Sequence, residues 1–144
     1  MTKIFFYHNA PDRLAAAVSL IGRVARQKKP ILVYAPDEAF ASALDRQLWI
    51  NPPTGFIPHV RENSALSAET LVVIASNTEN TTQNERLLNL STEVPPGFSR
   101  FTSVIELIDQ DETTRQAGRM RVRFYKDRGY EVQFFDLAGK NCWQ

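Results

Sequence analysis

Cysteine is almost absent from this sequence, since Cys142 is the single one among 144 residues. One thiol cannot form a disulfide within the chain, and it cannot supply a cysteine-based zinc site. Chains without disulfides are typical of the reducing cytosol, so we expect a cytoplasmic protein. The sequence also lacks any apolar run near the ~18 residues that a membrane span needs, so we expect no membrane partner.

Glycine is scarce as well, with six in the chain. The turn expected after the first strand, residues 8–12, contains none, so its backbone cannot approach a phosphate as a Rossmann or P-loop turn does. There is also no GxSxG elbow for a nucleophilic serine. The net charge of +1 provides no overall field that would attract nucleic acid. We therefore expect no cofactor, no metal and no catalytic residue.

What the sequence does contain is an alternation of short apolar segments and amphipathic segments, which predicts parallel strands joined by helical crossovers. The expected strands cover residues 3–7, 31–35, 71–75, 86–90, 104–108 and 130–135, the last at a sheet edge. The expected helices cover residues 13–27, 38–48 and 111–128, and Asp12 can cap the first. The fold class is α/β: a single domain over residues 1–138, with a mostly parallel sheet flanked by helices, Rossmann-like but without a phosphate-binding loop. Residues 139–144 are expected to be a flexible tail.

Polar residues at the expected strand ends leave an enzymatic alternative open. His8 follows the first strand, and Asp12 and Asp37 lie on the side of such a sheet where ligands bind. A histidine base assisted by a carboxylate, in a small nucleotide- or metal-using enzyme, would fit this pattern. A surface or capping histidine is the simpler interpretation, because no nucleophile, oxyanion hole or metal-ligand set accompanies it.

The late helix is strongly basic. Helical spacing predicts two faces on it. The residues expected to face the sheet are Ala117, Met120 and Phe124. The residues expected on an outward stripe are Arg115, Arg119, Val122 and Lys126. A row of cations with one apolar residue suits an acidic peptide with a hydrophobic end. Direct binding of single-stranded DNA and a merely solvated charged face are the alternatives.

The segment after the second helix is rich in proline but also carries large apolar residues. Pro52, Pro53, Gly55 and Pro58 rule out a continuing helix or a central strand. Trp49, Ile50, Phe56 and Ile57 accompany them. Side chains of this kind on a stiff loop either complete the domain's own core or form a patch for a partner protein.

The same segment carries a resemblance to a known family. The run Leu44-Asp45-x-x-Leu48-Trp49-x-x-Pro52-x-x-x-Phe56-Ile57-Pro58-His59 resembles the signature of the chi subunit of bacterial DNA polymerase III, a part of the clamp-loader complex. The opening Ile4-Phe5-Phe6-Tyr7, the Val-Ile-Glu-Leu-Ile strand at residues 104–108 and the Arg-x-Phe-Tyr-Lys element of the basic helix are similar too. The resemblance therefore covers nearly the whole chain.

The resemblance implies a replisome adaptor and a non-catalytic accessory subunit. One surface would bind the psi subunit, with contributions at the positions of Trp49 and Phe56. The other would bind the acidic, Phe-terminated C-terminal tail of single-stranded DNA-binding protein (SSB) at Ile108, Arg115, Arg119 and Val122. Contact with DNA would be indirect, through SSB. One position departs from the family, which carries an aromatic residue where this chain has Val122.

Overall fold

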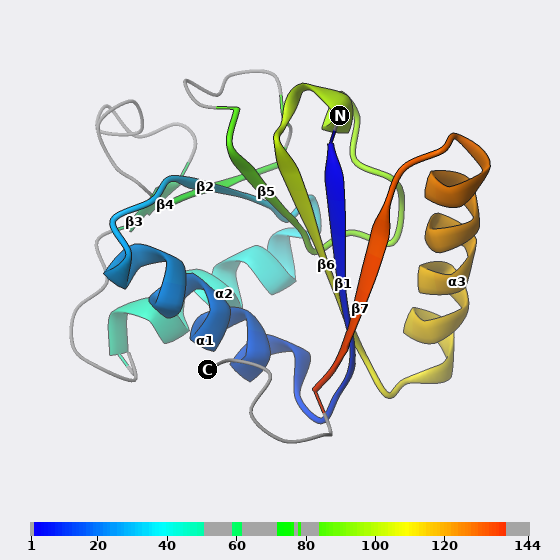
Figure 1. The fold of residues 1–144 in the computed structure, drawn as a ribbon. Coiled ribbons are helices and arrows are strands. Elements are labelled where there is room, and N and C mark those ends of the chain that lie inside the picture. The colour runs from blue at the N-terminus through cyan, green and yellow to red at the C-terminus, as the bar shows by residue number, and fades with distance from the viewer. Residues whose placement is uncertain (1, 51–58, 62–71, 77, 79–83, 138–144) are drawn as a thin grey trace.

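The computed structural model describes residues 2–50, 59–61, 72–76, 78 and 84–137. Seven strands form one sheet in this part of the chain, in the order β3-β4-β2-β5-β6-β1-β7 (Figure 1). The strands are β1 (Lys3–Ala10), β2 (Ile31–Tyr34), β3 (His59–Arg61), β4 (Val72–Ala75), β5 (Arg86–Asn89), β6 (Ser103–Asp109) and β7 (Val132–Asp136). Each pairing between neighbouring strands is parallel. The α/β class and the parallel sheet are confirmed.

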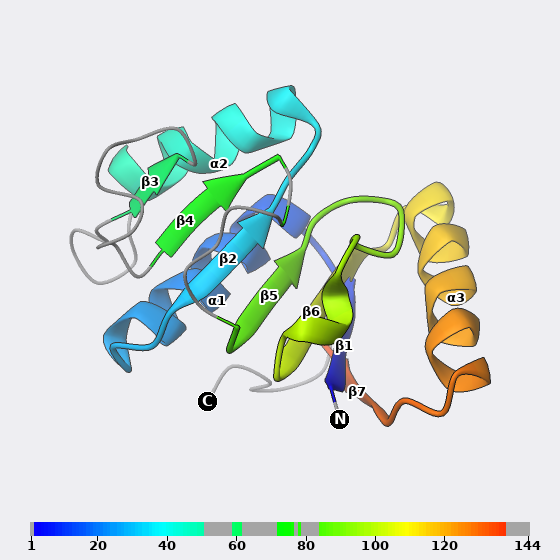
Figure 2. The same ribbon diagram turned by 90° about the horizontal axis from the view of Figure 1, so that it is seen from above.

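Three helices among the described residues cover the two faces of the sheet (Figures 1 and 2). They are α1 (Arg13–Arg26), α2 (Glu38–Ile50) and α3 (Glu112–Asp127), and a short 3-10 turn spans Phe98–Arg100. α1 and α2 lie on one face and α3 on the other. The reason is that α1 leads from β1 toward β2, whereas α3 leads from β6 over β1 to β7, and right-handed crossovers in opposite directions lie on opposite faces.

Successive side chains of β6 point to opposite faces of the sheet and pack in two separate hydrophobic clusters. Ile105 and Leu107 join the apolar cluster beneath α1 and α2, whereas Val104 belongs to the cluster beneath α3. Strands covered on both faces read as nearly continuous apolar runs, which is why the sequence pattern located most of them. The Asp12 carboxylate accepts hydrogen bonds from the backbone amides of Leu14 and Ala15, so its predicted role as the cap of α1 is confirmed.

Two features of the sheet were not predicted. β3 is three residues long and follows the proline-rich segment, where no strand was expected. β1 continues past Tyr7 to Ala10 through a register shift, and Asn9 adopts a left-handed backbone with φ 65°.

None of the helices in the described part of the chain has the length and apolar character to cross a membrane. The expected tail, residues 139–144, lies outside the described residues.

Candidate functional site

The rotation of α3 about its axis differs from the prediction. The residues buried against the sheet are Gly118, Arg121 and Tyr125. Met120, expected to face the sheet, is 74% exposed, so that prediction is wrong. Gly118 allows a close approach, because a Cβ there would lie 3.0 Å from Cδ1 of Ile108. The helix turns an arginine inward because a buried carboxylate of the sheet binds it.

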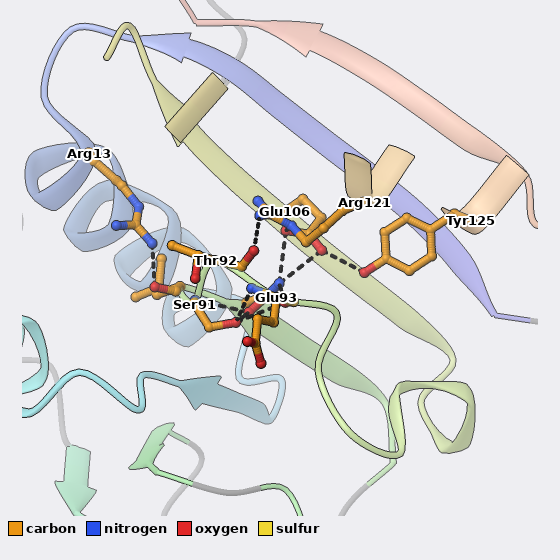
Figure 3. Close-up of polar contacts among 9 residues, drawn as sticks. Arg13, Ser91, Thr92, Glu93, Glu106, Arg121 and Tyr125 are labelled. Carbon is orange, nitrogen blue, oxygen red and sulfur yellow. Dashed lines mark hydrogen bonds and ion pairs between the residues drawn. The ribbon is translucent and has the colours of Figure 1, made fainter. Parts of the chain in front are cut away.

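That carboxylate is Glu106, in the middle of β6 and fully buried (Figure 3). Its Oε1 accepts a hydrogen bond from Nε of Arg121 at 2.9 Å, and its Oε2 accepts one from the Tyr125 hydroxyl at 2.6 Å. Nδ2 of Asn89 donates to both oxygens at 3.0 Å. Nη1 of Arg121 also donates to the carbonyl of Thr92 at 3.0 Å. Two residues of α3, one turn apart, are thereby held by one side chain of the sheet.

Burial perturbs the ionisation of this cluster. Burial raises the pKa of Glu106, whereas the charge of Arg121 and the hydrogen bonds from Tyr125, Asn89 and Arg121 lower it. Burial is also the main reason why the pKa of Tyr125 is raised well above its usual value. A buried pair of this kind is costly to break, because it would leave a charge without its partner. The cluster therefore fixes which face α3 turns outward.

One side of α3, next to its buried face, lines a pocket of about 480 Å³ between this helix and the sheet. The residues that line it are Phe6, His8, Asn9, Ile108, Arg115, Arg119, Val122 and Phe134. All four residues that the resemblance assigned to tail binding are among them. The pocket combines two cations with an apolar interior, and such a combination can hold an anion that also carries an apolar group.

The position of the pocket follows from the sheet topology. His8 and Asn9 lie near the end of β1, and Ile108 lies near the end of the neighbouring β6. The chain leaves these two adjacent strands toward opposite faces of the sheet. Open α/β sheets place their ligands at such a switch point, outside the carboxyl ends of the strands.

The two pocket arginines share an acidic neighbour, Glu112, in the first turn of α3. Its carboxylate lies 3.4 Å from Nη1 of Arg119 and 3.7 Å from Nη1 of Arg115. All three side chains are about half exposed or more, so these ion pairs are weak in water. An incoming carboxylate can replace Glu112 at modest cost.

Lys126, the last member of the predicted stripe, does not line the pocket. Its Nζ lies 5.1 Å from the centre of the Phe134 ring. This cation–π contact joins the C-terminal part of α3 to the edge strand β7.

The structure gives each residue of the enzymatic alternative different surroundings. His8 lines the pocket under α3. Asp12 caps α1, and Asp37 accepts a hydrogen bond from the amide of Ala39 and lines a different cavity, beside Arg13. Arg13, labelled in Figure 3, donates there to the carbonyl of Leu90, and its guanidinium lies over the ring of Phe40. Among the described residues, no group of three or more histidine, cysteine or acidic side chains is arranged to hold a metal ion.

The predicted psi-binding residues, Trp49 and Phe56, lie at the end of α2 and in the segment that follows it. Phe56 lies outside the described residues, and so does the side chain of Trp49, although the backbone of Trp49 belongs to the last turn of α2.

The sequence analysis missed three residues of the pocket, since Phe6, Asn9 and Phe134 were not proposed as site residues. The sequence pattern could have identified Phe134. Val132, Phe134 and Asp136 share one face of an edge strand, and a large aromatic ring on that face is expected to pack against another part of the protein or a ligand.

Comparison with known proteins identifies relatives of this chain. A family model described as DNA polymerase III chi subunit, HolC, matches residues 1–133. The DNA polymerase III subunit chi of Pseudomonas aeruginosa is 32% identical over 137 residues, which cover 92% of this chain and 95% of the relative. The subunit of the same name from Haemophilus influenzae is 26% identical over 81% of each chain. That of Escherichia coli is 25% identical over 84% of this chain and 86% of its own. The chain therefore belongs to the family of DNA polymerase III chi subunits.

Proposed function

We propose that this chain is a non-catalytic replisome adaptor that binds the acidic, Phe-terminated C-terminal tail of SSB in the pocket beneath α3. The observation that carries the proposal is the pocket itself, which gathers Arg115, Arg119, Val122 and Ile108 from two elements into one cavity. We also propose that the chain binds the psi subunit through Trp49 and Phe56 and is thereby linked to the clamp loader. Its place of action would be the cytoplasm, and its contact with DNA would be indirect.

The chemistry of the pocket suits such a tail. Arg115 and Arg119 can each receive a carboxylate, and the planar guanidinium orients it by paired hydrogen bonds. Ile108 and Val122 offer an apolar surface to the terminal ring. Each contact is weak by itself, but a chain held at both surfaces gains from the high effective concentration that the first contact provides for the second.

The test is a fluorescence anisotropy titration of a labelled peptide that copies the acidic, Phe-terminated tail. We expect saturable binding that weakens as salt is added, because exposed charges are screened. Arg119→Ala should weaken binding by about 1–3 kcal/mol, the range for a charge-assisted pair. Arg123→Ala is the matched control, since it removes the same charge from the same helix at a position that does not line the pocket.

Two further titrations separate this function from its alternatives. A peptide without the terminal Phe should bind much more weakly if the pocket accepts a ring. A single-stranded oligonucleotide without SSB should not compete with the tail peptide. Equal loss of affinity in Arg119→Ala and Arg123→Ala would show that binding follows the overall charge of α3, and it would contradict the assignment of the pocket.

A further inference from the structure

Phe134 is an exposed ring at the border of the pocket. It lies in the edge strand β7, and 48% of its surface is accessible. Within the described residues, the other large apolar side chain with comparable exposure is Met120, which does not line the pocket. An exposed aromatic side chain next to a cavity is a common feature of binding surfaces, where such rings supply much of the affinity.

The ring of Phe134 is held from several sides. The Phe6 ring meets it edge-on, with centroids 5.6 Å apart and an interplanar angle of 61°. The His8 ring is 6.3 Å away at 75°. Lys126 contributes the cation–π contact from α3. Because these neighbours restrict its motion before any ligand arrives, a partner ring that packs on Phe134 loses little affinity to the ordering of the site.

The helix side of the pocket offers no ring of its own. α3 contributes Arg115, Arg119 and Val122 to the lining, and valine has a small apolar surface. The aromatic surface comes instead from the sheet, through Phe6, His8 and Phe134. Of the two phenylalanines, Phe6 is 4% exposed, so Phe134 is the one with a face open to a ligand.

We infer that Phe134 is the specificity-determining residue of the pocket: it pairs with the terminal aromatic ring of the bound tail and makes the site prefer a Phe terminus over an aliphatic one. This inference rests on the proposed function. The arginines hold the carboxylates of any acidic tail, whereas Phe134 distinguishes one terminal side chain from another. Aromatic pairs gain more from an offset or edge-on contact than from buried area alone, and an aliphatic terminus lacks that gain.

The experiment compares two tail peptides that differ in the last residue, Phe or Leu, and measures the ratio of their Kd values for each variant. In the unchanged protein the Phe-ended peptide should bind more tightly. In Phe134→Leu the ratio should fall by about two- to tenfold, the range for an aromatic pair. Phe134→Tyr keeps the ring and should keep the ratio. Arg123→Met changes a residue of α3 that does not line the pocket, and it should keep the ratio as well.

The outcomes are distinguishable. An unchanged ratio in a folded Phe134→Leu protein that still binds both peptides overturns the inference but leaves the proposed function intact. Loss of the preference in Phe134→Leu, together with its retention in Phe134→Tyr, supports the inference. A failure of the unchanged protein to bind either peptide overturns both. Thermal melting of each variant excludes unfolding as the cause, and a ratio is insensitive to a lower fraction of folded protein.

Discussion

Oε1 of Glu112 accepts a hydrogen bond from Nη1 of Arg119 at 3.4 Å, across two turns of α3. The proposed site therefore already contains one carboxylate when the tail is absent. A bound peptide competes with this internal acid for the same guanidinium groups.

Glu112→Gln should tighten binding of the acidic tail peptide by about two- to fivefold, since an exposed ion pair of this kind is worth about 1 kcal/mol or less. Asp127→Asn is a suitable control, because it removes a negative charge from the other end of α3. Anisotropy titrations of both variants measure the effect. Weaker binding in Glu112→Gln would mean that this side chain orients the arginines and does not compete with the ligand.

Arg121→Met should destabilise the fold by about 3–5 kcal/mol, because it leaves the buried Glu106 carboxylate without its charged partner. Chemical denaturation measures the loss. The double variant Glu106→Gln with Arg121→Met should lose less than the sum of the two single changes, since the groups lie in one hydrogen-bonded cluster. Strict additivity would contradict this coupling. Arg123→Met, on the exposed side of the same helix, should change stability little.

We expect the protein to lose stability at alkaline pH because of the buried Tyr125 hydroxyl. Burial, followed by the charge of Glu106, raises the pKa of Tyr125 above its usual value of 10.0. The folded protein therefore keeps this hydroxyl protonated above pH 10, whereas the unfolded chain ionises there. Below pH 10 the protonated Tyr125 hydroxyl contributes fully to the free energy of unfolding. Above pH 10 this contribution falls by about 1.4 kcal/mol per pH unit.

Denaturation curves of the unchanged protein and of Tyr125→Phe between pH 8 and pH 11 measure this contribution. Tyr125→Phe should be less stable at pH 8, since Glu106 loses a hydrogen-bond donor, but its stability should fall less steeply above pH 10. Parallel curves would show that Tyr125 contributes nothing to the alkaline transition.

Gly118→Ala should destabilise the protein although alanine favours helices. The added Cβ would lie 3.0 Å from Cδ1 of Ile108 and 3.1 Å from Cζ of Phe6. Overpacking of about 1–3 kcal/mol exceeds the gain in helix propensity of up to about 1 kcal/mol. Tail affinity should fall as well, because both neighbours line the pocket. Met120→Ala, at an exposed position, should leave stability within about 0.5 kcal/mol. A stabilised Gly118→Ala protein would show that α3 moves outward at no cost.

Trp49→Ala should reduce co-purification of the psi subunit without lowering the melting temperature of the isolated chain. The reason is that the proposed role of Trp49 is contact with a partner and not packing in the core. Pull-down with tagged psi and thermal unfolding are measured on the same preparation. A large fall in melting temperature would assign Trp49 to the domain's own core, the alternative that the sequence left open.

Sequence patterns predicted the structure correctly where a type of residue nearly always occupies the same kind of environment. Apolar runs such as Ile31–Tyr34 indicate buried strands, and Asp12 before an amphipathic segment indicates a cap. Three of the four residues of the predicted stripe on α3, Arg115, Arg119 and Val122, line one pocket, whereas Lys126 does not.

The same reasoning failed where a tertiary partner reverses a residue's usual preference. Apolar periodicity predicts Met120 in the core of α3, but Glu106 in the opposite strand draws Arg121 inward and leaves Met120 exposed. A glutamate inside an otherwise apolar strand, together with an arginine and a tyrosine four residues apart on a helix, was the available signal. β3 escaped notice because three residues are too few to show a period.

The sheet order also determines how this fold would bear mechanical load. α2 packs on β3 and β4 near one edge, whereas α3 packs on β6 and β7 at the other. With neighbouring strands about 4.8 Å apart, the two edge strands are separated by about 29 Å. A pull between partners bound at α2 and α3 would act across the strands and along their hydrogen bonds. Such tension would reach the ladder between β2 and β5, where three residue pairs, Leu32 to Tyr34 against Leu87 to Asn89, join the two halves of the sheet.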